Sequence, residues 1–372
     1  MKSGFEMKDT FRQAWLMGKG GPWEIKELPI PKPGYGQLLV KMQASSICNQ
    51  TDLNTIKALH PPHDHQVTLM YPHHFRIWDK RVPDKLSHAY PQRPYVHAPY
   101  PSTMGHEGMG VVVEVGPYTA HEQSMMASSD YFKVGDRVSI VATVGGFGEY
   151  VISDAAALIK VPDSLGDEEA SLYEPVLVVY NVLKQIMALG DRVLILGQGA
   201  LGLIATQMAK AMGANQIIVS EPIAFKRELA KKFGADIALD PGRTHIVHEI
   251  ERITDGKGMP VVIEAAGKPE TIEIIPYVTA LGAKVGQIGA CCDPVLTDWS
   301  YIHFKGMKVV SSGHEYHVNG ALPNQWKTCM QIMATYLDMK PLITHRYRLD
   351  DIDQAFRDVE TGNVIKGVFL FD

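Results

Sequence analysis

The chain has 372 residues, of which 45% are hydrophobic and 21% charged, and its formal net charge is −5 at pH 7. This length accommodates two domains with separate cores, and the composition is that of an ordinary globular protein. No basic block occurs, which argues against a nucleic-acid partner or an anionic membrane surface. No apolar stretch reaches membrane-spanning length, no apolar leader opens the chain, and four cysteines are too few for a disulfide framework, so we expect a protein of the reducing cytoplasm.

The sequence of the first third of the chain predicts short strands and one long excursion. Residues 1–12 are expected to form a loose lead-in, and residues 14–28 and 37–46 alternate as strands do. Residues 54–104 are rich in proline, aromatic residues and histidine, and this density of proline excludes long helices and central strands. Because glycine and serine are scarce there, we expect an ordered excursion and not a flexible linker.

The rest of the chain first predicts more strands and then a regular alternation of strands and helices. Strands are expected over residues 104–116, 132–140, 145–152, 193–196, 217–220, 236–239, 260–264, 283–288, 307–311, 344–348 and 364–371. Helices are expected over residues 167–189, 200–211, 224–233, 244–253, 270–281, 322–337 and 349–360. The alternation within residues 191–313 predicts a parallel sheet that is covered by helices on both faces.

A glycine motif stands between a short apolar strand and a helix. Gly197, Gly199 and Gly202 form the pattern G-x-G-x-x-G directly after residues 193–196. The first glycine allows a tight turn, the second lets the backbone approach a pyrophosphate, and the third lets the helix pack on the strand. The free N–H groups at the helix N-terminus, near Ala200 and Leu201, would face the phosphates. This arrangement predicts a dinucleotide site.

An acidic residue closes the second strand of this unit. Glu221 can accept hydrogen bonds from the ribose hydroxyls of the adenosine, and its carboxylate would repel the 2′-phosphate of NADP. NAD is therefore the expected cofactor. Lys226 and Arg227 follow closely and weaken the preference, and Lys226 is also expected to contact the cofactor.

A second group of residues could hold a metal ion. Cys48, His106, Glu107 and Glu174 together offer sulfur, nitrogen and oxygen donors, a mixture that suits Zn²⁺. Three protein ligands with one exchangeable position are typical of catalytic zinc. Taken singly, each residue has an ordinary alternative: a small buried cysteine, a histidine in a turn, or a solvated acid at a helix start.

The sequence resembles the zinc-dependent medium-chain dehydrogenase/reductase family, which includes alcohol, sorbitol and threonine dehydrogenases. The matching stretches are SSICNQTD, GHEGMGVVVEVG, KVGDRV, GGFGEYV, SLYEPVLVVYNVL, VLILGQGALG and YRLDDIDQAFRDVETGNVIKGVFLF. The resemblance implies an α/β protein with a doubly wound parallel Rossmann domain over residues 181–313. It also implies a mostly β GroES-like catalytic domain over residues 1–180 and 314–372, with residues 54–104 as an insertion, and a homodimer or homotetramer.

The same resemblance assigns roles at the metal site. Cys48 and His106 become ligands of one catalytic zinc ion. Glu107 and Glu174 share the remaining role, one binding the metal and the other holding its water, in either order. Cys48, His106 and Glu174 are thus expected to be catalytic residues. No structural zinc is expected, because the four-cysteine lobe that often follows GDRV in the family is missing.

Two further departures from the family bear on the reaction. The family usually has a hydroxyl residue two positions after the cysteine to relay a proton, but here Gln50 stands at that position and Thr51 comes one residue later. Either Thr51 serves as the relay or the relay has changed. Residues 54–104 replace a much shorter loop beside the substrate cleft. His60, His63 and His65 could hold a second metal there, but we favour a role as polar loop residues or as lining of the substrate cleft.

The expected reaction is zinc-dependent hydride transfer between NAD and a small polar secondary alcohol of the polyol, sugar or amino-alcohol type. Thr51 would pass the proton toward solvent. The changed relay also motivates an alternative, a redox-neutral lyase or epimerase that uses bound NAD on the same fold. A third hypothesis is a non-enzymatic NAD-binding or structural role, against which Cys48, His106 and Glu174 argue.

Overall fold

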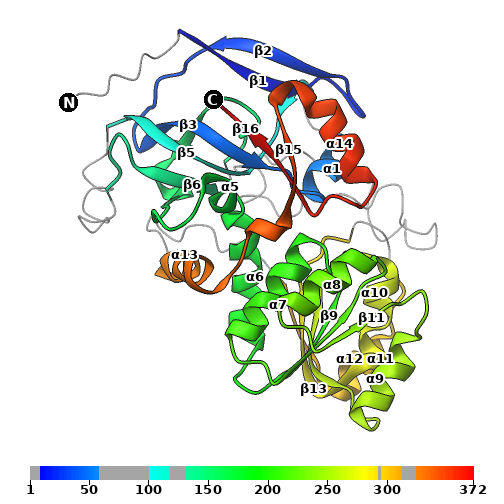
Figure 1. Cartoon of the computed structure of the whole chain (residues 1–372). Coiled ribbons are helices and arrows are strands. Elements are labelled where there is room, and N and C mark those ends of the chain that lie inside the picture. Colours follow the sequence, from blue (N-terminus) through cyan, green and yellow to red (C-terminus); the bar gives the residue numbers. More distant parts are fainter. Residues whose placement is uncertain (1–8, 58–99, 118–130, 142, 292–294, 312–323) are drawn as a thin grey trace, which may run out of the picture.

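The computed structural model describes residues 9–57, 100–117, 131–141, 143–291, 295–311 and 324–372, which form two bodies stacked one on the other (Figure 1). Most of the excursion over residues 54–104, including His60, His63 and His65, lies outside the described residues. Its ordered character therefore stays a prediction. In the part of the chain that is described, no helix is both long and apolar enough to cross a bilayer.

The upper body in Figure 1 is built mainly from antiparallel strands. A three-stranded sheet runs in the order β2-β1-β4, and a seven-stranded sheet has the path β15-β16-β3-β5-β6-β8 with β7 paired to β3. The strands are β1 (Thr10–Leu16), β2 (Trp23–Pro29), β3 (Gln37–Ser46), β4 (Ser102–Thr103), β5 (Glu107–Val115), β6 (Arg137–Val141), β7 (Tyr150–Asp154), β8 (Leu158–Lys160), β15 (Ile343–Tyr347) and β16 (Lys366–Leu370). This mostly β body is the GroES-like part that the resemblance implies.

The beginning of the chain differs from the prediction. The single strand expected over residues 14–28 is a hairpin, in which β1 pairs antiparallel with β2 and residues 17–22 turn between them. The glycines at 18, 20 and 21 and Pro22 provide this turn, which the alternation of the flanking residues concealed. The predicted lead-in is also too long, because β1 begins at Thr10.

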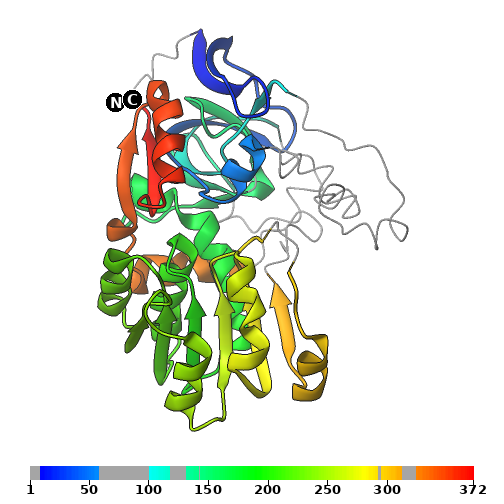
Figure 2. The ribbon, with the colours of Figure 1, turned by 90° about the vertical axis from the view of Figure 1, so that its right-hand side faces the viewer.

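The lower body is a parallel sheet in the order β11-β10-β9-β12-β13-β14. Its strands are β9 (Arg192–Leu196), β10 (Gln216–Ser220), β11 (Ile237–Leu239), β12 (Met259–Glu264), β13 (Thr279–Gln287) and β14 (Lys308–Ser311). Alternate side chains of β9 enter different clusters. Val193 and Ile195 pack with α6 (Tyr173–Ile186) and α7 (Ala200–Ala211), whereas Leu194 and Leu196 pack with α9 (Ile246–Thr254) and α11 (Ile275–Val278). Both faces are thus covered, and Figure 2 shows the sheet between its helices. This is the predicted doubly wound Rossmann sheet.

The helices are α1 (Thr51–Ile56), α5 (Asp167–Ala170), α6 (Tyr173–Ile186), α7 (Ala200–Ala211), α8 (Ala224–Lys232), α9 (Ile246–Thr254), α10 (Pro269–Glu273), α11 (Ile275–Val278), α12 (Trp299–Lys305), α13 (Asn324–Tyr336) and α14 (Ile352–Glu360). The helix expected over 270–281 ends earlier, because Thr279 pairs with Met259 in the sheet, and α12 was not predicted. One helix was expected over 167–189, where the structure has α5 and α6.

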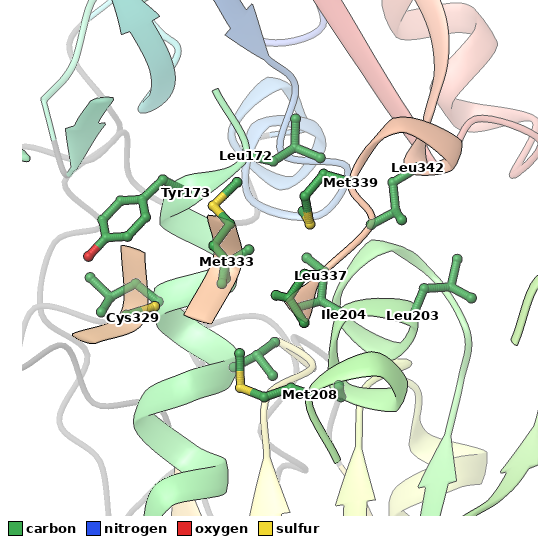
Figure 3. Packing of buried hydrophobic residues seen from close by; sticks show 14 of the residues in the cluster. Leu172, Tyr173, Leu203, Ile204, Met208, Cys329, Met333, Leu337, Met339 and Leu342 are labelled. Carbon is green, nitrogen blue, oxygen red and sulfur yellow. The ribbon is translucent and has the colours of Figure 1, made fainter. Parts of the chain in front are cut away.

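The core between the two bodies is built around α6. Figure 3 shows Tyr173 of α6, Met208 of α7 and Met333 of α13 within one buried cluster. The hydroxyl of Tyr173 donates a hydrogen bond of 2.8 Å to the carbonyl of Trp326. The domain limits at residues 180 and 314 stay a prediction, because α6 runs across the first and the second falls outside the described residues.

Candidate active site

A cavity of about 430 Å³ lies where the two bodies meet. The upper body contributes the loop before α1, the start of β5 and the segment before β16. The lower body contributes the N-terminus of α7 and the carboxyl ends of β12 and β13, and α6 supplies its first turn. The cavity is lined by Cys48, Asn49, Gln50, Thr51, Leu53, Asn54, Lys57, His106, Glu107, Glu174, Pro175, Val178, Gly199, Ala200, Leu201, Lys226, Ala265, Ala266, Lys268, Ile288, Ala290, Val364 and Lys366.

Three of the predicted metal ligands converge on one side of this cavity. One ligand atom each of Cys48, His106 and Glu107 lies within 4.8 Å of the others. The pairing of β3 with β5 produces this convergence, because Ser46 lies opposite Glu107 and the chain reaches Cys48 two residues later. A thiolate, an imidazole and a carboxylate form a donor set that zinc accepts. The residues present therefore fit the metal that the sequence predicts.

Asp52 supports two of these ligands. Its carboxylate accepts a hydrogen bond of 2.9 Å from the backbone N–H of Cys48, and its other oxygen lies 3.5 Å from Nδ1 of His106. Burial lowers the pKa of His106, but the bonds to Asp52 and Cys48 outweigh burial, so the pKa is raised. A carboxylate behind a ligating histidine fixes the orientation of the ring.

Glu107 has partners other than a metal. Lys366 of β16 and the hydroxyl of Ser46 both donate hydrogen bonds to the same oxygen of its carboxylate. Lys366 also donates a hydrogen bond of 2.9 Å to the carbonyl of Ile47. The lysine thus balances the charge of a carboxylate that is almost completely buried.

Glu174 occupies the first turn of α6 and faces the same cavity. Burial and the nearby carboxylate of Glu107 raise its pKa, while the positive charges of His106 and Lys366 act in the opposite direction. Its carboxylate lies outside the compact group formed by the other three residues. The structure thus brings all four predicted metal residues to one cavity, and the carboxylate of Glu174 is farther from the other three ligand atoms than these are from one another.

The two candidates for the proton relay have different surroundings. Thr51 begins α1 and lines the cavity, and its carbonyl accepts a hydrogen bond of 2.9 Å from the hydroxyl of Thr55. The side chain of Gln50 is instead hydrogen-bonded to the backbone of Ala290, across the cavity.

The glycine motif closes the opposite side of the cavity. Gly197 has φ of +92°, and a Cβ atom there would collide with Ala266. A Cβ at Gly202 would strike the carbonyl of Gly197, so the helix approaches the turn as closely as predicted. A Cβ at Gly199 would meet nothing in the protein within 4 Å, which leaves room for a ligand against the backbone. Ala200 and Leu201 follow in the first turn of α7 and line the cavity.

The acidic residue after β10 points back to this turn. The carboxylate of Glu221 accepts hydrogen bonds from the N–H groups of Gln198 at 2.7 Å and Ile223 at 3.0 Å. Lys226 donates to the carbonyl of Gly362 at 2.8 Å, and burial lowers its pKa, while the nearby Glu221 opposes this effect. Arg227 pairs with Asp240 at 3.0 Å. Both cations next to Glu221 are therefore engaged within the protein.

Two stretches of the chain match known protein families. Residues 82–163 match the alcohol dehydrogenase GroES-like domain, and residues 200–335 match the zinc-binding dehydrogenase domain. The chain is 32% identical to L-threonine 3-dehydrogenase from Pyrococcus horikoshii and 33% identical to that from Pyrococcus abyssi. Each alignment spans 371 residues and covers 93% of this chain and 94% of the relative. The chain belongs to the zinc-dependent medium-chain dehydrogenase family.

Solved structures agree with this family in fold. The 2R,3R-butanediol dehydrogenase from Bacillus subtilis has a TM-score of 0.74 at 24% identity, with 97% of this chain and 100% of that chain covered. The benzyl alcohol dehydrogenase from Acinetobacter calcoaceticus has a TM-score of 0.75 at 20% identity, with 98% and 100% covered. The family membership and fold class predicted from the sequence are thus confirmed.

Three residues of the site were not given a role in the sequence prediction. Asp52 belongs to the stretch SSICNQTD, so its proximity to the cysteine was a usable signal. Lys366 was visible as a single lysine in an apolar strand, which indicates a buried charge with a partner. Ala290 carried no signal, because only its backbone contacts Gln50.

Proposed function

We propose that this protein is an NAD-dependent zinc alcohol dehydrogenase that acts on a small polar secondary alcohol. The observation that carries the proposal is one cavity with a metal-ligand group on one side and a glycine-rich dinucleotide turn on the other. A substrate held between them would have its hydroxyl near the metal ligands and its carbon near the nicotinamide. The names of the relatives, which are alcohol dehydrogenases, support this reaction class.

Cys48, His106 and either Glu107 or Glu174 would hold the zinc ion. Zinc supplies a Lewis acid that lowers the pKa of an alcohol hydroxyl. Asp52 keeps the imidazole of His106 and the loop of Cys48 in position. We favour Glu174 as the acid that exchanges with substrate or water, because Glu107 is already bonded to Lys366 and Ser46.

Thr51 is the proposed relay for the substrate proton. It lines the cavity three residues from Cys48, and its hydroxyl can both accept and donate a proton. Gln50 cannot take this role, since an amide neither gains nor loses a proton near neutral pH and its carboxamide is bonded to Ala290.

NAD is the proposed nucleotide. Glu221 places a carboxylate beside the glycine turn, where a 2′-phosphate would be repelled. Lys226 and Arg227 could offset this repulsion only by giving up their bonds to Gly362 and Asp240. Gly199, with its open surface, and the N–H groups near Ala200 and Leu201 would receive the pyrophosphate.

The substrate class is inferred from the cavity and the relatives. Asn54, Lys57 and Lys268 give the cavity wall polar and charged groups, which suit a substrate with a second polar function. L-Threonine and 2R,3R-butanediol, named in two of the relatives, both carry a secondary hydroxyl with a polar neighbour. We therefore propose a polyol, sugar or amino alcohol.

The test is a panel of such alcohols with NAD⁺ and NADP⁺, followed by the near-ultraviolet absorbance of the reduced nucleotide and by chromatography of the products. The proposal predicts net NADH formation with at least one secondary alcohol and a lower kcat/KM with NADP⁺. Conversion of a substrate without net NADH would instead favour the redox-neutral lyase or epimerase. No conversion by a zinc-loaded protein that binds NAD⁺ would contradict both.

A homo-oligomer is part of the proposal. Among the described strands, β14 lies at the end of the parallel sheet and pairs on one side only, with β13. Exposed apolar side chains stand nearby, with Trp299 at 71% and Phe304 at 80% exposure. An edge strand beside exposed aromatic residues is a natural contact for a second copy. Light scattering should give a dimer or tetramer, and a monomer at all concentrations would contradict this part.

The proposed location is the cytoplasm. Cys48 and Cys329 form no disulfide, and Cys48 must stay reduced to bind a metal. Fractionation of cells that contain a tagged chain would test this, and recovery outside the cytoplasm would contradict it.

A further inference from the structure

Gln50 connects the two walls of the cavity. Oε1 of its side chain accepts a hydrogen bond of 3.0 Å from the backbone N–H of Ala290, and its Nε2 donates to the carbonyl of the same residue. Gln50 stands at the start of α1 in the upper body, and Ala290 follows β13 in the lower body. The two residues are 240 positions apart in the chain.

The place where this contact forms is shaped for a close approach. Gly267 follows β12 with φ of +62°, and a Cβ atom there would collide with the amide nitrogen of Gln50 and lie 2.8 Å from the carbonyl of Ala290. The N–H of Gly267 is itself held by Glu264 at 2.9 Å. The backbone around the contact is therefore fixed, and only a residue without a side chain leaves room for the carboxamide.

The contact binds a primary carboxamide through two hydrogen bonds, one to its oxygen and one from its nitrogen. A backbone N–H and C=O of one residue present one donor and one acceptor, and a carboxamide complements both. The nicotinamide ring of NAD carries the same carboxamide group. If the pyrophosphate lies at Gly199 and the reacting alcohol lies near Cys48, the nicotinamide end comes to the part of the cavity that Gln50 and Ala290 line.

We propose that Gln50 occupies the carboxamide-binding groups of Ala290 while the cofactor is absent and is displaced when the nicotinamide binds. The inference rests on the proposed function, because it needs a nicotinamide cofactor in this cavity. It gives Gln50 a role as an internal competitor for the cofactor, at the position where a hydroxyl relay was expected. Displacement frees its amide at the start of α1, close to the metal ligands.

The experiment compares Gln50→Ala with the unchanged chain, using NAD⁺ and ADP-ribose as the two ligands. ADP-ribose contains the adenosine and pyrophosphate but no nicotinamide, so it does not compete for Ala290. Removal of the competitor should lower the Kd for NAD⁺ about tenfold, the size expected when one or two net hydrogen bonds no longer have to be broken. The Kd for ADP-ribose should stay the same. Gln354→Ala, which removes an exposed carboxamide bonded to Asp358 on α14, is the matched control and should change neither.

A second measurement needs no nucleotide. Because the N–H of Ala290 is donated to Gln50, its amide hydrogen should exchange faster in Gln50→Ala than in the unchanged chain or the control. Unchanged exchange, unchanged or weaker NAD⁺ binding, or an equal gain for ADP-ribose would each overturn the inference. An unchanged chain that binds neither ligand contradicts the proposed function and the inference with it, whereas normal binding without these differences contradicts the inference alone.

Discussion

The ammonium group of Lys366 is bonded to the carboxylate of Glu107, and the two side chains are only 3% and 1% exposed. The pair joins β16, near the end of the chain, to the start of β5 and places a positive charge behind the metal-ligand group. Burial of either charge alone would destabilise the fold. Each residue offsets part of the desolvation cost of the other.

Lys366→Met should destabilise the protein, because it leaves the charge of Glu107 buried without its partner. The expected loss in free energy of unfolding is about 3–5 kcal/mol, measured by urea denaturation with a metal chelator present. The double variant Lys366→Met with Glu107→Gln removes both charges and should recover most of the loss. If Lys366→Met is as stable as the unchanged chain, the ion pair contributes little to the free energy of unfolding.

Glu221→Ser should weaken NAD⁺ binding and improve NADP⁺ binding in relative terms, since the repulsion of the 2′-phosphate disappears. The ratio of the two Kd values should shift by about tenfold or more, which corresponds to ~1.4 kcal/mol. Circular dichroism should confirm that the variant keeps its secondary structure without the hydrogen bond between Gln198 and Glu221. If the unchanged chain already binds NADP⁺ more tightly, the assignment of Glu221 is wrong.

Thr51→Val should reduce turnover while zinc and NAD⁺ stay bound, because valine keeps the shape of the side chain and removes its hydroxyl. Proton relay typically contributes 10²–10⁴-fold, so kcat should fall by about that range. Thr51→Ser keeps a hydroxyl and serves as the control, with activity near normal. Near-normal turnover of Thr51→Val would exclude the relay and leave water or another group in that role.

The stability of the C-terminal region should depend on acid pH through Asp358. The hydrogen bond from Tyr347, 2.9 Å long, and that from Gln354 hold the pKa of Asp358 below its usual value. A carboxyl group whose pKa is lower in the folded than in the unfolded chain stabilises the fold at pH values above its unfolded pKa of about 4. This contribution is lost as the pH falls through the pKa of the folded state. Tyr347→Phe should therefore lower Tm at pH 7 and lower it less as the solution is acidified.

Tyr336→Phe is the control for this measurement, because Tyr336 is 65% exposed. Its effect on Tm should be small and independent of pH. A deficit of Tyr347→Phe that stays constant from neutral to strongly acid pH would contradict the link to Asp358.

The sequence allowed the nucleotide-binding unit to be predicted closely, because its signals are local. The glycines at 197, 199 and 202 stand next to a strand of five residues and a helix of twelve, and periodicity alone places both. The hairpin of β1 and β2 was missed, because the turn over residues 17–22 interrupts two strands of similar alternation. The glycines and the proline of this turn reverse the chain, although the alternation of apolar and polar residues on either side suggests one continuous strand.

The sequence predicted four residues that the structure places at one cavity, but it did not predict the contacts that hold them there. Cys48, His106, Glu107 and Glu174 come together because β3 pairs with β5 and α6 packs below them, as the family resemblance implied. The contact between Lys366 and Glu107 joins residues 259 positions apart, and no local pattern specifies such a pairing. The same holds for Gln50 and the backbone of Ala290, whose contact depends on how the two bodies meet.

The measurement that tests the central claim most directly is the zinc content and NADH formation of Cys48→Ala beside the unchanged chain. We predict one zinc ion per unchanged chain, and in Cys48→Ala almost no zinc and no turnover, with NAD⁺ still bound. Cys329→Ala is the matched control, because Cys329 is a buried residue of α13 that packs in the same cluster as α6 and does not line the cavity, so its loss should leave zinc content unchanged. Full zinc content and normal turnover in Cys48→Ala would contradict the account.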